Sequence, residues 1–128
     1  MIKEDYVSFE VAKLLKEKGF DELCIFKYNS EGVRMKAGVA IDEWQNSELD
    51  DDECSCVSHQ MAMKWLRQTH NIHITISLTS DSYYKYEIHR LHSNYPIELK
   101  LSEEVEEYYN QYEQACESAV KYCLENLI

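Results

Sequence analysis

One stretch, residues 58–90, switches from a helical to a strand-like spacing of apolar side chains, and it constrains the fold more than any other part of the chain. The apolar residues first recur at steps of three and four, which places them on one face of a helix over 59–70. From Ile72 onward they alternate with polar residues, as in a strand with one buried face. After a short polar run the alternation resumes. The stretch therefore predicts a helix followed by an antiparallel hairpin of strands 72–79 and 83–90.

The register of this hairpin follows from parity. A slip of one residue would turn every side chain of a strand to the opposite face. A three-residue loop, Ser80 to Ser82, keeps the apolar residues of both strands on one side. The same register sets His73 opposite His89 on the polar face, where the two imidazoles are weak candidates for a metal site.

The remaining patterns predict an α+β fold in a single domain, residues 1–128, which is long enough to bury a core. Ser8 is a predicted N-cap and Gly19 a predicted stop of the first helix. We expect a small antiparallel β-sheet covered by the helices. The predicted elements are helices 9–18, 59–70 and 111–127, an N-terminal hairpin 23–28/33–41, a central hairpin 72–79/83–90 and a short strand 97–101.

The C-terminal segment allows two interpretations. Apolar residues keep a helical period from Ser102 to the end of the chain, which fits one continuous helix, 102–127. Asn110 with Glu113 three residues later forms a capping-box pattern, which would begin a separate helix there. We favour the break, with the main helix at 111–127.

The segment 42–56 is acidic and contains no Lys or Arg. Such a run is typical of a solvated loop, so we predict a mobile acidic loop here. It lacks the alternating ligands, central glycine and final Glu of an EF-hand, and we predict no cofactor. Trp44 in this loop is a candidate interaction residue, although we favour its packing against the core.

The net charge of −11 argues against a general affinity for nucleic acid, because phosphate binding needs clustered Lys and Arg. The chain has five cysteines, an odd number, and no apolar segment of the signal-peptide or membrane-spanning type. These features predict a cytoplasmic protein with reduced thiols and no membrane association.

Cys54, Cys56 and His59 are the closest approach to a metal-binding constellation. Thiolates and imidazole suit zinc, which takes four such ligands in a structural site. No second ligand pair stands at a familiar spacing, so free thiols in a loop are the favoured interpretation. A catalytic thiol is disfavoured, because the acidic neighbours would raise its pKa. Since phosphate-binding loops and nucleophile motifs are also absent from the sequence, we expect a protein that is not an enzyme.

Tyrosine is unusually common, with ten in the chain. Exposed tyrosines are frequent anchors of protein interfaces. Tyr83 and one of Tyr108 or Tyr109 are predicted to be exposed, and all three are candidate interaction residues. They predict a protein partner and leave the oligomeric state open, a homodimer included.

Three segments carry a resemblance: YVSFEVAKLLKEKGF, HQMAMKWLRQTHNIHI and YEQACESAVKYCLENLI. They resemble a set of small hypothetical proteins from Bacteroidales genomes, often found in prophage-like regions. The resemblance implies regulation, host takeover or virion-related work by a protein of phage or mobile-element origin. It implies no catalytic residue.

The predicted order helix, three strands, helix over residues 58–127 is similar to that of double-stranded-RNA-binding domains. The last helix, following a three-stranded sheet, resembles that of HicB-type antitoxins. Order alone is an analogy of fold, and it implies a nucleic-acid-linked regulator. Our leading interpretation is a non-enzymatic interaction protein, with that regulator as the alternative and a zinc-binding module as the second alternative.

Overall fold

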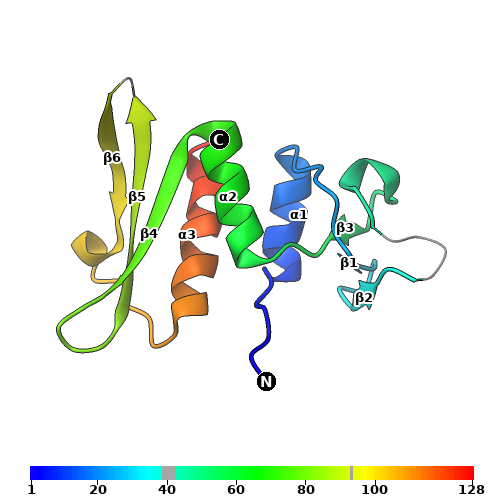
Figure 1. Cartoon of the computed structure of the whole chain (residues 1–128), viewed down its shortest axis with the longest axis horizontal. Coiled ribbons are helices and arrows are strands. Elements are labelled where there is room, and N and C mark those ends of the chain that lie inside the picture. Colours follow the sequence, from blue (N-terminus) through cyan, green and yellow to red (C-terminus); the bar gives the residue numbers. More distant parts are fainter. Residues whose placement is uncertain (39–42, 93) are drawn as a thin grey trace. The chain divides into compact units, whose positions relative to one another are not determined.

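A computed structural model describes residues 1–38, 43–92 and 94–128. The chain divides into two compact units, residues 1–58 (unit 1) and 59–128 (unit 2) (Figure 1). Each unit combines helix with antiparallel strands, so the α+β class is confirmed. The strands form two three-stranded sheets and not the one small sheet that we expected, because β1 pairs with β2 and β3, whereas β5 pairs with β4 and β6. The single domain stays a prediction.

Unit 1 contains five elements in chain order: α1 (Phe9–Glu17), β1 (Phe26–Tyr28), β2 (Arg34–Lys36), the 3-10 turn η1 (Asn46–Glu48) and β3 (Cys54–Ser55). Its sheet has the order β2-β1-β3, and both pairings are antiparallel. The predicted N-terminal hairpin is therefore confirmed, with shorter strands. Its predicted residues 39–41 lie outside the described residues.

Both predicted ends of α1 are confirmed. Ser8 caps the helix, since its hydroxyl oxygen accepts a hydrogen bond from the Val11 amide at 3.2 Å. At the other end Gly19 adopts a φ of +96°, a conformation that favours glycine. The Phe20 amide then donates to the Leu15 carbonyl at 2.9 Å, which is the closing bond of a Schellman ending.

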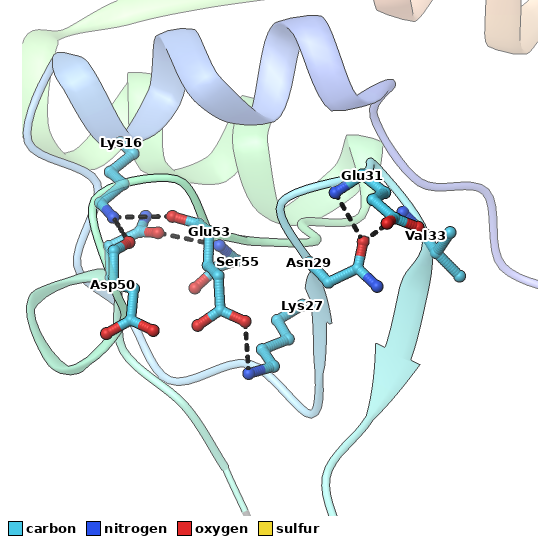
Figure 2. Close-up of polar contacts among 9 residues, drawn as sticks. Lys16, Lys27, Asn29, Glu31, Val33, Asp50, Glu53 and Ser55 are labelled. Atoms are coloured by element: carbon cyan, nitrogen blue, oxygen red, sulfur yellow. Dashed lines mark hydrogen bonds and ion pairs between the residues drawn. The ribbon is translucent and has the colours of Figure 1, made fainter.

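Two lysines hold the described part of the acidic segment, residues 43–56 (Figure 2). The Lys16 ammonium on α1 donates to the carbonyl oxygens of Asp50 and Glu53, each at 2.7 Å. The Lys27 ammonium on β1 pairs with the Glu53 carboxylate at 2.9 Å. The segment thus contains η1 and β3 and is tied to α1 and β1, although its mobility stays a prediction.

Two asparagines supply further side-chain hydrogen bonds to the backbone of unit 1. Asn46 is buried, donates to the Phe20 carbonyl at 2.7 Å and accepts from the Ser55 amide at 2.8 Å. Asn29 accepts hydrogen bonds from two backbone amides of the β1–β2 turn (Figure 2). We did not predict β3, because two residues are too few to show an alternating pattern.

Unit 2 contains six elements in chain order: α2 (His59–His70), β4 (Ile72–Leu78), β5 (Tyr84–His92), β6 (Tyr95–Leu101), the 3-10 turn η2 (Ser102–Val105) and α3 (Tyr112–Asn126). Its sheet has the order β4-β5-β6, and both pairings are antiparallel. Both helices lie on the same side of this sheet (Figure 1). The bounds of α2 are those that the sequence predicted.

The predicted register of the central hairpin is confirmed. Ile74 pairs with Ile88, and His73 pairs with His89. The loop has the three residues that we expected, and its last residue, Ser82, has a φ of +66°. A left-handed third residue is typical of three-residue hairpin loops.

The apolar side chains of unit 2 that are at most 7% exposed come from both helices and from the inner face of the sheet. This set confirms that Trp65 is buried and that Cys116 and Cys123 are core residues. Its members are Ala62, Met63, Trp65, Leu66, Ile72, Ile74, Tyr86, Ile88, Ala115, Cys116, Ala119, Val120, Cys123 and Leu124.

The break before the last helix is confirmed, but its predicted cap was wrong by one residue. The capping box uses Gln111 and Gln114, and not Asn110 and Glu113. The reason lies just upstream, where the backbone of Tyr109 pairs with β5 in an extended conformation. The chain leaves that pairing at residue 110, so α3 begins only after Gln111.

Candidate functional site

A cavity of about 450 Å³ lies at the turn of the β4–β5 hairpin, and we call it the tyrosine cavity. It brings together two residues that the sequence singled out as interaction candidates, Tyr83 and Tyr108, from segments far apart in the chain. All of its lining residues belong to unit 2. They are Leu78, Thr79, Ser80, Asp81, Tyr83, Lys85, Glu103 and Tyr108.

A backbone bridge orients the two tyrosines. Tyr84 and Tyr109 exchange both of their hydrogen bonds, at 2.7 and 2.9 Å. Since successive side chains of extended backbone point to opposite sides, their preceding neighbours Tyr83 and Tyr108 point the other way. The Tyr109 ring stacks on Tyr86, whereas Tyr83 and Tyr108 are 45% and 46% exposed. The expectation that one of Tyr108 and Tyr109 is exposed is confirmed, and Tyr108 is that residue.

The hairpin loop fixes the backbone of Tyr83. Its amide donates to the Thr79 hydroxyl at 3.1 Å, and its carbonyl accepts from the Thr79 amide at 2.7 Å. The Ser82 amide closes the turn by donating to the Thr79 carbonyl at 3.1 Å. The ring of Tyr83 is therefore exposed on a backbone that is already held in place.

Two of the residues that line the tyrosine cavity form an ion pair. The Lys85 ammonium lies 2.9 Å from the Glu103 carboxylate and joins β5 to η2. The hydrogen bond to Glu103 raises the pKa of Lys85, so the amine stays charged near neutral pH. None of the lining residues is His or Cys, and a protonated lysine is no nucleophile. The arrangement presents two exposed tyrosine rings beside a charge pair, which suits the binding of a partner.

Sequence reasoning missed Lys85 and Glu103. The alternation of β5 puts Lys85 on the same face as Tyr83, so the register could have identified it. Nothing in the sequence identified Glu103, because it is placed by the fold-back of the chain after β6. That fold-back depends on Glu106, whose φ of +57° ends η2 without a glycine.

The thiols of Cys54 and Cys56 are buried, Cys54 on β3 and Cys56 directly after it, and not in the loop that we expected. Burial raises the pKa of Cys54 to about 11, and it also raises the pKa of Cys56. We had attributed such a rise to the acidic neighbours. The main cause is instead loss of solvent, and the charges of Lys16 and Lys13 oppose it at Cys54. Neither thiol has the low pKa of a reactive nucleophile.

His59 lies in unit 2, where its Nε2 is 3.0 Å from a carboxylate oxygen of Glu117. Its other ring nitrogen, Nδ1, is buried without a hydrogen-bond partner in the described structure. In residues 1–38, 43–92 and 94–128, no three metal-binding side chains gather into a possible site. A zinc module built on Cys54, Cys56 and His59 therefore draws no support from the geometry.

Trp44 is half-buried, as packing against its own unit would require. The Lys27 ammonium lies 4.9 Å from the centre of its ring, a cation–π contact. Its backbone exchanges two hydrogen bonds with Cys24, at 2.7 and 2.8 Å. These contacts give Trp44 a structural place in unit 1, and its role in binding stays a prediction.

Comparisons of the chain with models of protein families, with curated proteins and with solved structures found no significant match. Among the described residues, no helix has the length and apolar character needed to cross a membrane. The likeness to proteins of Bacteroidales genomes and to HicB-type antitoxins stays a prediction. The function is therefore argued from the geometry of this chain.

Proposed function

We propose that the chain is a non-enzymatic interaction protein, and that it binds a protein partner with the tyrosine cavity. The convergence of Tyr83 and Tyr108 on one cavity carries this proposal. Tyrosine offers a large, rigid and amphipathic contact surface at a low cost in conformational entropy. Because hydrogen bonds already hold the backbone of Tyr83, the binding of a partner would cost little conformational entropy at this residue.

The charge of the surface around the tyrosine cavity indicates which class of protein partner it would bind. Asp81 lines the tyrosine cavity, and Glu106 and Glu107 directly precede Tyr108 in the chain, all three with exposed side chains. The whole chain carries a net charge of −11. A partner segment that combines basic side chains with an apolar one would complement this surface and associate faster at low salt.

We extend the proposal to the origin of the protein and to the cellular compartment in which it acts. The resemblance to proteins of prophage-like regions supports a phage or mobile-element origin, which genomic neighbourhood tests directly. All five cysteines are free thiols, and a reducing cytoplasm suits such a protein. A second copy of this chain is one form that the partner could take.

The test uses the double variant Tyr83→Ser/Tyr108→Ser, with Tyr95→Ser as its matched control. Tyr95 is also exposed and lies on the sheet of unit 2, but it does not line the tyrosine cavity. We expect affinity capture from the source cells to recover a protein with wild type and with the control, and to lose it with the double variant. Sedimentation of the purified chain reveals whether that partner is a second copy. Recovery of the same proteins by the double variant contradicts the proposal.

A nucleic-acid-linked regulator is the second candidate, and the order α2-β4-β5-β6-α3 favours it. Two basic residues of unit 2 that could contact phosphates are engaged elsewhere: Lys85 pairs with Glu103, and Arg90 donates to the Leu127 carbonyl at 3.1 Å. We therefore expect no tight binding of duplex RNA or DNA. A mobility-shift assay at about 150 mM salt checks this, since non-specific complexes alone have Kd values of about 10⁻⁴ to 10⁻⁶ M. Submicromolar binding would promote this candidate over the first.

A further inference from the structure

A second cavity, of about 480 Å³, lies where α2 gives way to β4, at the opposite end of β4 from the hairpin turn. We call it the histidine cavity, because the opposed pair His73 and His89 lines it. Its volume is in the ordinary range of small-molecule sites. The lining residues all belong to unit 2 and are Arg67, Asn71, Ile72, His73, His89, Leu91 and Pro96.

Two backbone irregularities shape the histidine cavity. Asn71 has a φ of +57°, which ends α2 and places Arg67, one turn earlier in the helix, beside the start of β4. A register shift between β5 and β6 occurs at Ile88/His89, and beyond it Leu91 pairs with Pro96. Proline is tolerated there because β6 is an edge strand of its sheet.

The lining combines apolar side chains with polar groups that can donate hydrogen bonds. Leu91 and Pro96 supply apolar surface, and Leu91 is 59% exposed although it is a large apolar side chain. Arg67 supplies a guanidinium with five N–H donors, and an imidazole has at least one N–H donor in either protonation state. None of the lining residues that the structure describes is acidic, in a chain with 24 acidic residues.

The guanidinium of Arg67 makes no hydrogen bond or ion pair within the part of the chain that the structure describes. Glu98 lies opposite His89 on β6, but it is not among the described residues that line the cavity. A fixed cation beside apolar surface can bind a carboxylate through two parallel N–H donors.

We propose that the histidine cavity binds a small organic anion, in which a carboxylate is attached to an apolar body. The carboxylate lies on Arg67 and accepts hydrogen bonds from the imidazoles of His73 and His89. The apolar body covers Leu91 and Pro96. This site is separate from the tyrosine cavity, so the proposal does not depend on the proposed partner.

The test titrates the full chain with three probes, benzoate, 2-naphthoate and decanoate, near neutral pH. Binding is followed by ¹H–¹⁵N NMR spectra, which also report where each probe binds. We expect at least one probe to bind and to shift the signals of Arg67, His73 and Leu91. The uncharged amide of the same probe should bind at least about tenfold more weakly, because it lacks the charge that Arg67 recognises.

Two variants separate the charge from the apolar surface. Arg67→Gln should weaken carboxylate binding by about tenfold or more and leave the weak amide binding unchanged. Leu91→Ser should weaken both. Both residues are exposed, so these variants should keep the dispersed spectrum of the folded chain. Tyr83→Ser is the matched control and should bind the probe as wild type does, even if it loses a protein partner.

Any one of four results overturns the proposal. All three carboxylates could fail to shift any cavity signal at millimolar concentration. The amide could bind as tightly as the acid, which would make the site an apolar one. Carboxylate binding could survive Arg67→Gln unchanged, or its shifts could map to a different surface.

Discussion

The two sheets are held in different ways. β4 and β5 pair over seven residues and carry Ile74, Tyr86 and Ile88 on a buried face. β1 and β2 pair over three residues, and every residue of β2 is exposed. What fixes the smaller sheet is a set of side-chain hydrogen bonds to backbone groups, made by Lys16, Asn46 and Asn29. The larger sheet thus carries a periodic apolar face, whereas the smaller sheet adds side-chain hydrogen bonds to the apolar packing around β3.

This difference predicts how substitutions act. Removing apolar volume from unit 2 should destabilise the fold strongly, because a cavity remains where packing was lost. Removing a polar side chain from unit 1 should leave backbone groups without hydrogen-bond partners, and the cost should be smaller and more local.

The largest expected effect is that of Trp65→Ala. Trp65 is 7% exposed on α2, and truncation of such a residue costs about 3–5 kcal/mol. Chemical denaturation measures the change in the free energy of unfolding. Gln68→Ala, on the exposed side of the same helix, is the control and should stay within about 0.5 kcal/mol of wild type. If the Trp65 variant is as stable as this control, packing does not hold unit 2.

The second expected effect tests unit 1. Asn46→Ala leaves the Phe20 carbonyl and the Ser55 amide without their partner, at a cost of about 2 kcal/mol. Amide hydrogen exchange should show faster exchange at Ser55. The neighbouring variant Ser47→Ala should change neither quantity, because the serine side chain is exposed. An unchanged exchange rate at Ser55 would show that β3 does not depend on this hydrogen bond.

The same contrast explains what the sequence could predict. The bounds of α2, the register of the central hairpin and both ends of α1 were predictable, because apolar spacing and local capping residues determine them. β3 was not, because Asn46 and Lys16 place it through contacts between residues distant in sequence. A buried asparagine has no periodic pattern that would distinguish it from a loop residue.

The tyrosine cavity and the histidine cavity were likewise predictable from the sequence only in part. The exposure of Tyr83 was predictable from the alternation of its strand. The meeting of Tyr83 with Tyr108 was not, because it needs the left-handed turn at Glu106, where no glycine indicates one. The histidine cavity was half predictable: the register opposed His73 and His89, but it said nothing about Arg67.

A smaller effect is expected from Lys16→Met, which keeps an apolar stem and removes the ammonium. The loss should be about 1 kcal/mol, because hydrogen bonds from an exposed charge are discounted by solvent. Exchange of the Glu53 amide, which donates to the Asp50 carbonyl, should accelerate, and exchange on β4 and β5 should not. Lys3→Met is the control, because Lys3 is exposed near the N-terminus. Equal acceleration in both sheets would mean that the lysine stabilises the whole chain.

The last expected effect appears only at alkaline pH and is absent near neutral pH. An exposed thiol has an ordinary pKa of 9.0, whereas burial raises that of Cys54 to about 11. Between these values the unfolded chain binds fewer protons than the folded chain, so stability falls as pH rises. One thiol contributes about 1.4 kcal/mol of this loss by one pH unit above its unfolded pKa, because one pKa unit corresponds to about 1.4 kcal/mol.

Cys54→Ala should therefore flatten the dependence of the unfolding free energy on pH between about 9 and 11. Val57→Ala is the matched control in unit 1: it also removes buried apolar atoms, but it should lower the whole curve without changing its slope. Cys123→Ala makes the comparison between units, since burial raises the pKa of Cys123 to about 12 and its contribution should extend to higher pH. Denaturation curves at several pH values measure all three. If Cys54→Ala keeps the wild-type slope, the thiol of β3 is solvated in the folded chain, and the polar contacts of unit 1 do not keep water away from it.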